Sequence, residues 1–116
     1  DVEWRPATET RAARRAEIAD GSVVLPGGFG TYEEAFEVLT GNQLGIISTP
    51  VVFLDVTLSL AAASFYDPLF EFIAGATAAG FMKPQHGVLA QRAATPAEAV
   101  SIAAGPAPEF ARKWVG

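Results

Sequence analysis

A short apolar run that leads straight into a glycine-rich turn constrains this chain more than any other feature. Residues 22–25 read SVVL, residues 26–30 read PGGFG, and the apolar side chains of residues 31–44 recur at helical spacing. A short, apolar, β-branched run with turn signals at its end is typical of a buried strand. The stretch therefore predicts a strand, a tight turn and a helix in succession, which is a unit of parallel α/β sheets.

The rest of the chain alternates in the same way. The segment from Thr8 to Ala19 is rich in Ala, Arg and Glu and predicts a helix. Three strands make a narrow sheet, so we expect a parallel α/β sheet that is flanked by helices and lacks its N-terminal strands. Residues 1–116 are expected to form one domain, with a Pro-rich tail from residue 105. The further predicted strands are 49–56 and 87–93. The further predicted helices lie within 65–81, with Gly80 as the stop, and within 96–104, with Thr95 as the cap, and Gly45 is expected to stop the helix over 31–44.

Charge and composition exclude several classes of function. The 116 residues carry 8 basic and 13 acidic side chains, a net charge of −5, which disfavours binding to nucleic acid polymers. The chain has no cysteine and only one histidine, His86, so we expect no metal site. No apolar run approaches the roughly 18 residues of a membrane span. We also find no signal peptide, and a cytoplasmic protein without membrane contact is the expectation.

The glycine turn is suited to binding a phosphate. Ligands of open α/β sheets bind beyond the carboxyl ends of the strands, where Gly27, Gly28 and Gly30 are expected to lie. Glycine lets the backbone approach a ligand closely, and a helix start offers N–H groups to an anion together with the Thr31 hydroxyl. The turn matches neither the dinucleotide fingerprint nor the Walker sequence, so the pattern alone is weak evidence.

Glu34 has two interpretations. Thr31 and Glu34 fit the S/T-x-x-E capping box, in which the glutamate reaches back to the first residue of the helix, and this is the commoner reading. However, Glu33 and Glu34 would repel an anion at the same helix start. A helix that served phosphate alone would be better without them, which indicates a second task for one of these carboxylates.

The residues LPGGFGTYEE resemble the P-G-G-x-G-T-x-x-E motif of the LONELY GUY family, the cytokinin riboside 5′-monophosphate phosphoribohydrolases, often labelled lysine decarboxylase-like. The similarity continues through EVLTGNQLGI and PVVFLDV, and it resumes at YDPLFEFI, AAGFMKP and ATPAEAV. It therefore covers the chain from residue 8 to about residue 100.

The resemblance implies a Rossmann-like fold, usually a homodimer, that hydrolyses the N-glycosidic bond of a nucleoside 5′-monophosphate. AMP or a cytokinin riboside monophosphate would be the substrate, and free base and ribose 5-phosphate the products, with no cofactor. Glu34 and Arg11 would form the catalytic pair. The phosphate- and substrate-binding residues that it implies are Gly27, Gly28, Gly30, Thr31 and Glu33.

The chain also departs from the family pattern. Family members carry M-H-x-R-K upstream, and an ungapped alignment keeps only the arginine, as Arg11, whereas a gapped one would use Arg14. Residues 57–64 form an insertion. A decarboxylase would need a Schiff-base lysine, and neither Lys83 nor Lys113 is near the turn. A non-catalytic nucleotide- or phosphate-binding module, or a dimerisation module, derived from the family is the alternative function.

Other polar and aromatic residues have plainer expectations. His86 is predicted at the surface or in a turn, because a lone histidine is rarely catalytic without a partner. Tyr66 and Trp114 are predicted to pack rather than to contact a ligand. Asp67 and the proline after it predict a helix cap, and Gln43 could line either a pocket or a dimer seam.

Overall fold

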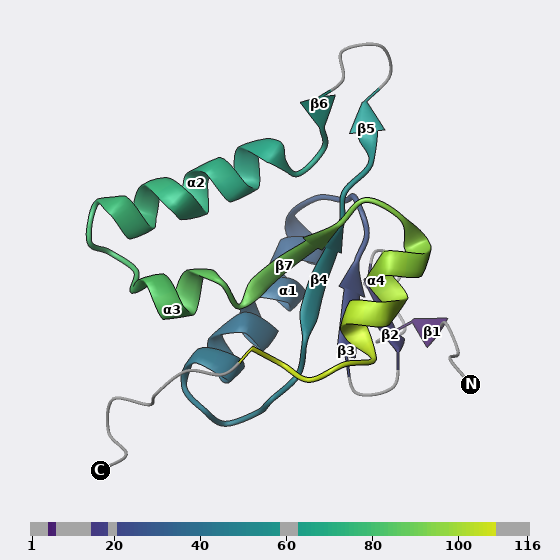
Figure 1. Cartoon of the computed structure of the whole chain (residues 1–116), viewed down its shortest axis with the longest axis horizontal. Helices are drawn as coiled ribbons and strands as arrows, with labels where there is room; N and C mark the ends of the chain where they lie inside the picture. The colour runs from purple at the N-terminus through teal and green to yellow at the C-terminus, as the bar shows by residue number, and fades with distance from the viewer. Residues whose placement is uncertain (1–4, 7–14, 19–20, 59–62, 109–116) are drawn as a thin grey trace.

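Three parallel strands form the centre of the fold, as the alternating pattern predicted (Figure 1). The computed structural model describes residues 5–6, 15–18, 21–58 and 63–108. β4 (Val51–Leu54) lies between β3 (Gly21–Val24) and β7 (Ala90–Ala93), and both pairings are parallel. All four residues of β3 and all four of β4 are buried, which explains their continuous apolar runs.

Two further strands extend the sheet beyond β3, and they correct one prediction. β2 (Arg15–Ile18) pairs antiparallel with β3, and β1 (Arg5–Pro6) pairs antiparallel with β2. The predicted helix over 8–19 is therefore wrong for residues 15–18, and the other residues of that segment lie outside the described ones. Local propensity favours a helix here, but β2 supplies hydrogen-bond partners to an edge of β3 that would otherwise have none.

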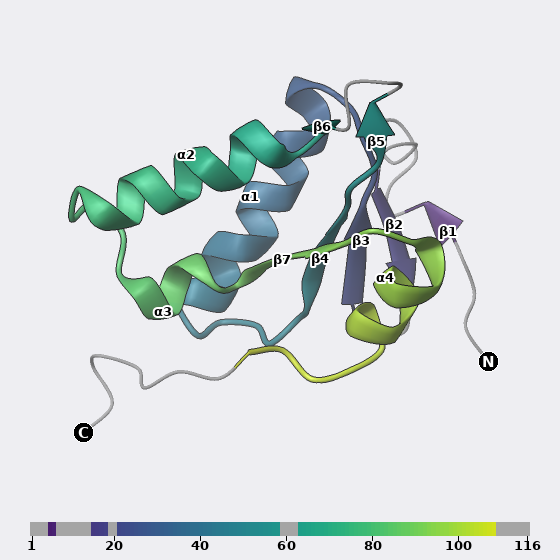
Figure 2. The same cartoon turned by 45° about the horizontal axis from the view of Figure 1, so that its top comes forward.

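Helices cover both faces of the parallel strands (Figure 2). α4 (Pro96–Ala103) packs on one face against β3, β4 and β7. α1 (Phe29–Gln43) and α2 (Asp67–Ala78) cover the other face, and the short α3 (Pro84–Gly87) follows α2. The sheet and its helices confirm the expected α/β architecture.

A small antiparallel pair interrupts this alternation after β4. β5 (Thr57–Leu58) pairs with β6 (Ala63–Ser64) within the segment that the sequence marked as an insertion. The pair stands at the carboxyl end of β4 (Figure 1). It connects β4 to α2 and adds no strand to the main sheet.

Each face of the sheet has its own apolar core. Val23 and Val52 pack with Ala99 and Ala103 on the α4 face. Phe53 packs with Tyr66 on the α1 and α2 face, together with Val24, Val51 and Ala35. The side chains of β3 and β4 thus alternate between two helix layers, as expected for strands buried on both faces.

The helix ends follow the predicted signals with one shift. Gly45 and Gly80 have positive φ angles of 77° and 90° after α1 and α2, as predicted for helix stops. Thr95 caps α4 by accepting a 3.1 Å hydrogen bond from the Glu98 N–H. Asp67 is the first residue of α2 rather than its cap, which is Tyr66, and its carboxylate accepts from the Ser64 N–H instead.

Candidate phosphate-binding turn

The glycine turn joins the carboxyl end of β3 to the start of α1. It lies at the edge of the sheet where β4 and β7 also end (Figure 1). Gly28 is the cap residue of α1, with extended φ and ψ angles of −127° and −150°, and no side chain caps the helix. Since the first-turn N–H groups of any α-helix lack an intrahelical acceptor, this helix start can donate to a ligand.

The predicted capping box is wrong. α1 begins at Phe29, so Thr31 lies inside the helix and is not its cap. Glu34 cannot serve a Thr31 cap that does not exist, and the first turn of α1 holds no acidic residue. The helix begins earlier because Gly28 takes the extended conformation of a cap and its carbonyl accepts the first helical bond, 3.1 Å from the Tyr32 nitrogen.

Thr31 has an unsatisfied hydroxyl. Its side chain is 1% exposed, and its Oγ1 atom has no hydrogen-bond partner among the described residues. A buried hydroxyl without a partner costs free energy, and such groups are concentrated at functional sites. The hydroxyl belongs to the first turn of α1, directly after the glycine turn.

The two glutamates differ in their surroundings. Glu33 is exposed, whereas Glu34 is half-buried. At 100° per residue, Glu34 lies beside the buried face formed by Thr31 and Ala35, on the flank opposite Tyr32. Glu34 is also about 8 Å along the helix axis from Phe29, from the rise of 1.5 Å per residue. Glu34 therefore lies in the half of α1 that begins at the glycine turn.

The other half of the implied catalytic pair lies outside the described residues. This holds for Arg11 and for the gapped alternative, Arg14. Both precede β2, which contacts α1. The pairing of Glu34 with either arginine stays a prediction.

Two tyrosine hydroxyls hold the backbone of the turn, a role that the sequence did not reveal. The Tyr32 hydroxyl donates to the Gly27 carbonyl at 2.8 Å, and the Tyr66 hydroxyl donates to the Leu25 carbonyl at 2.6 Å. Tyr66 is 1% exposed, so its predicted packing role is confirmed and a hydrogen bond is added to it. A phenol with its ring in an apolar core needs such a partner, and that is the signal that could have found it.

A charged cluster lies at the same edge of the sheet. Arg92, on β7, donates to both Asp55 and Asp67, and its guanidinium lies 4.5 Å from the centre of the Phe70 ring. The hydrogen bond to Asp55 raises the pKa of Arg92. The backbone hydrogen bond from Ser64, followed by that from Arg92, lowers the pKa of Asp67. The cluster joins β4, α2 and β7.

Asp55 also binds the backbone of Tyr66. Its Oδ1 atom accepts from the Tyr66 N–H at 2.8 Å, and the residue is buried at the end of β4. A buried carboxylate needs both a counter-charge and hydrogen bonds, and Asp55 has both. The backbone at Tyr66 is thereby fixed beside the sheet.

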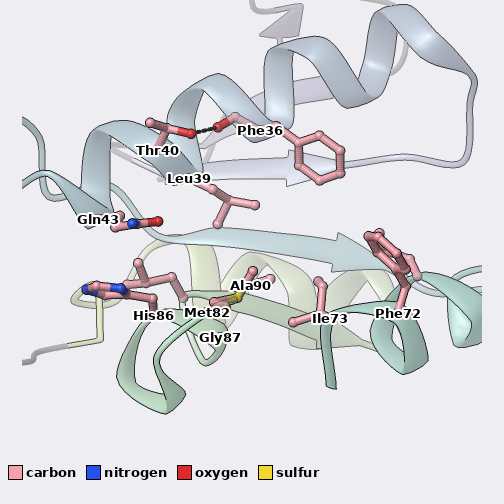
Figure 3. A pocket seen from close by; sticks show the side chains of 12 residues that line it. Phe36, Leu39, Thr40, Gln43, Phe72, Ile73, Met82, His86, Gly87 and Ala90 are labelled. Carbon is pink, nitrogen blue, oxygen red and sulfur yellow. Dashed lines mark hydrogen bonds between the residues drawn. The ribbon is translucent and has the colours of Figure 1, made fainter. Parts of the chain in front are cut away.

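An apolar cavity of about 280 Å³ lies between α1, α2 and α3. Figure 3 shows Phe36 and Phe72 at one end, and Gln43 and His86 at the other. None of the residues that line the cavity belongs to the glycine turn. Gln43 lines this cavity, which is one of its two predicted places, and His86 lies half-buried on the single turn of α3.

Among the described residues, no group of three or more His, Asp or Glu side chains could hold a metal ion. No helix in the described part of the chain has the length and apolar character needed to cross a membrane.

Comparison with known proteins identifies relatives of this chain. The family described as possible lysine decarboxylase matches residues 5–102. The cytokinin riboside 5′-monophosphate phosphoribohydrolase LOG of Oryza sativa subsp. japonica is 41% identical over 90 residues, covering 71% of this chain and 35% of the relative. LOG2 of Arabidopsis thaliana is 45% identical over 76 residues, covering 63% and 33%.

A bacterial relative gives the same picture. The cytokinin riboside 5′-monophosphate phosphoribohydrolase of Rhodococcoides fascians is 42% identical over 74 residues, covering 64% of this chain and 34% of the relative. The chain thus spans about a third of the length of these relatives. The family match over most of its residues, together with these identities, shows that the chain belongs to the LONELY GUY family, whose shared domain is described as a possible lysine decarboxylase.

Proposed function

We propose that this chain carries the phosphate- and ribose-binding part of a phosphoribohydrolase that acts on nucleoside 5′-monophosphates. The observation that carries the proposal is the helix start of α1, where the glycine turn leads directly to the buried, unsatisfied Thr31 hydroxyl. The relatives are phosphoribohydrolases of cytokinin riboside 5′-monophosphate, so AMP or such a nucleotide is the proposed substrate.

The phosphate would be bound by backbone. The N–H groups at the start of α1 and the positive end of the helix dipole attract an anion. Gly27, Gly28 and Gly30 allow the phosphate to come close to the main chain. Thr31 would add its hydroxyl after a small movement of the turn, because its oxygen is enclosed. Glu33, which is exposed next to this helix start, would contact the sugar side of the substrate.

Glu34 would act on the ribose. Cleavage of an N-glycosidic bond passes through an oxocarbenium-like sugar, and a nearby carboxylate stabilises the growing positive charge. The same carboxylate can orient the attacking water. Arg11 is too basic to donate a proton readily, so its proposed role is to position Glu34 or the departing base. Neither step requires a metal or an organic cofactor.

The test is release of free base from AMP and from isopentenyladenosine monophosphate, followed by chromatography. Glu34→Gln is expected to abolish release and to leave thermal unfolding nearly unchanged. Glu37→Gln is the matched control, because Glu37 is an exposed glutamate on the same helix. Equal turnover by the Glu34→Gln variant and the wild type would refute the catalytic role of Glu34.

A nucleotide-binding module without turnover is the second candidate. Only the arginine of the upstream M-H-x-R-K pattern is retained in the sequence, which favours this alternative. Calorimetry with AMP separates the two functions. Binding without base release supports the module, whereas binding with release supports the enzyme.

We include homodimer formation in the proposal. Phe72 on α2 is 74% exposed, and Phe36 on α1 is also exposed beside the apolar cavity (Figure 3). A second copy over this face would remove both rings from water. Light scattering is expected to give a dimer that Phe72→Glu dissociates. Ala97→Glu, on the exposed side of α4 across the sheet, is the control and should leave the dimer intact.

A further inference from the structure

Three carbonyl groups in and just before the glycine turn accept hydrogen bonds. The Leu25 carbonyl accepts from the Tyr66 hydroxyl, the Gly27 carbonyl from the Tyr32 hydroxyl, and the Gly28 carbonyl from the Tyr32 backbone N–H. Two tyrosines therefore account for all three bonds. Neither ring belongs to the turn itself, since Tyr32 lies on α1 and Tyr66 precedes α2.

The bond to Gly27 determines where a donor of the turn points. No peptide bond among the described residues is cis. In a planar trans peptide, the carbonyl of one residue and the N–H of the next point in opposite directions. Because the Gly27 carbonyl points at Tyr32, the Gly28 N–H points away from it. The described part of the chain supplies no acceptor for this N–H, and Gly28 is exposed.

Tyr66 holds the backbone where β3 leads into the turn. Its hydroxyl donates to the Leu25 carbonyl, and the next residue, Pro26, has no N–H to orient. The Tyr66 ring packs edge-on against Phe53, with ring centres 4.9 Å apart. Its backbone N–H is bound by Asp55. Burial raises the pKa of Tyr66, so the hydroxyl keeps its proton and remains a donor.

The rings of the two tyrosines also contact each other. Their centres are 6.4 Å apart at an interplanar angle of 76°, an edge-to-face arrangement. The pair therefore forms one support beneath the turn, anchored to the sheet through Tyr66 and to the helix through Tyr32. Gly27 and Gly28 precede α1, whereas Gly30 lies inside it. The two glycines give the turn wide conformational freedom, and this support restricts it.

We propose that Tyr32 and Tyr66 are positioning residues that orient the Gly28 N–H toward a bound phosphate group. The inference rests on the proposed function, because it concerns the anion that the same turn would bind. The ligand class is a phosphomonoester, such as a nucleoside 5′-monophosphate. Neither hydroxyl touches the ligand, since each is engaged by a carbonyl of the turn. Both act by fixing a donor in advance of binding.

The test measures binding of AMP and of inorganic phosphate by calorimetry, which does not depend on hydrolysis. Tyr32→Phe and Tyr66→Phe keep the rings and remove only the hydroxyls. Each is expected to weaken AMP binding about fivefold to tenfold, the effect of one hydrogen bond that organises a charged contact. The double variant should lose less than the product of the two single effects, because both support one turn.

The matched control is Thr77→Val. Thr77 donates a 2.9 Å hydrogen bond from its hydroxyl to the Ile73 carbonyl within α2, so its removal also deletes a hydroxyl-to-carbonyl bond. If the tyrosine hydroxyls only stabilise the fold, all three variants will lower the melting temperature and none will change AMP affinity. That result would overturn the inference.

Turnover, where it is observed, gives a second readout. The free energy of phosphate binding is the same in the ground state and the transition state. The tyrosine variants should therefore raise KM and leave kcat nearly unchanged. If the wild type binds AMP without releasing base, the proposed enzyme fails while calorimetry still tests the tyrosines. If the wild type binds neither AMP nor phosphate, the inference is refuted.

Discussion

Gly28→Ala should show whether glycine is needed at this position for folding or for binding the phosphate. A methyl group built on Gly28 meets no atom within 4 Å, and the φ angle of −127° is one that alanine adopts. Nothing in the described chain therefore requires glycine at this cap position. The methyl group would instead occupy space next to the Gly28 N–H, where we place the phosphate.

Opposing small effects set the expected change in stability. Alanine lowers the entropy of the unfolded chain, which stabilises the fold by about 0.4–1 kcal/mol. It is also a poorer cap residue than glycine, which costs a similar amount. The free energy of unfolding should therefore change by less than about 1 kcal/mol. Urea denaturation followed by circular dichroism measures this change.

The effect on binding should be much larger. Losing one charge-assisted hydrogen bond costs about 1.5–3 kcal/mol, or roughly 10- to 150-fold in affinity. Calorimetry with AMP measures it. Gly75→Ala is the control, because a methyl group at Gly75 in α2 also meets nothing within 4 Å. That variant should bind AMP like the wild type. A Gly28→Ala protein that is stable and binds AMP with unchanged affinity would refute a phosphate contact at this turn.

Three further changes test the fold and its electrostatics. Gly21→Ala should cost several kcal/mol in urea denaturation, because its methyl carbon would lie 2.1 Å from a backbone oxygen of α4; a cost below about 1 kcal/mol would contradict this close approach. Thr95→Ala should cost about 1 kcal/mol, because it removes the cap bond to the Glu98 N–H, and an unchanged denaturation midpoint would contradict the cap. The hydrogen bond from the Ser64 N–H, followed by that from Arg92, lowers the pKa of Asp67 in the folded chain. These contacts therefore stabilise the fold above the ordinary aspartate pKa of about 3.9, and their contribution is lost as the pH falls through the lower folded value. Melting temperatures from pH 7 to pH 2 should fall less steeply for Asp67→Asn than for the wild type, and parallel curves would contradict this assignment.

Features specified by neighbouring residues could be predicted from the sequence. The apolar runs of β3 and β4 predicted strands that are buried on both faces. Thr95 and the proline after it predicted the start of α4, because the cap hydroxyl and the Glu98 N–H that donates to it lie within one turn. In each case the residues that specify the element also belong to it.

Two predictions were wrong, one because of a pairing with a neighbouring strand and one because of the backbone conformation of the turn. Residues 15–18 have helix-forming composition, yet they pair with β3. Thr31 and Glu34 match a capping box, yet Gly28 ends the turn three residues earlier. The sequence pattern alone does not show which strand edge needs a partner. Nor does it show which residue of a turn is the last one before the helix begins.

The tyrosine support could not be predicted for a related reason. The Tyr66 hydroxyl and the Leu25 carbonyl are 41 residues apart, and no spacing rule joins them. The motif located the glycine turn and its glutamates through a resemblance. The motif gave no information about the side chains that hold the backbone of the turn.

The same 41-residue separation has a consequence for the order of events during folding. β3 and α1 are adjacent in the chain and can form early, but the bond between Tyr66 and Leu25 closes a long loop, which is slow and entropically costly. The turn therefore reaches its final shape only after β4 and the residues before α2 have packed. Affinity for phosphate would thus arise last, and ligand binding during refolding would report completion of the native state instead of formation of its secondary structure.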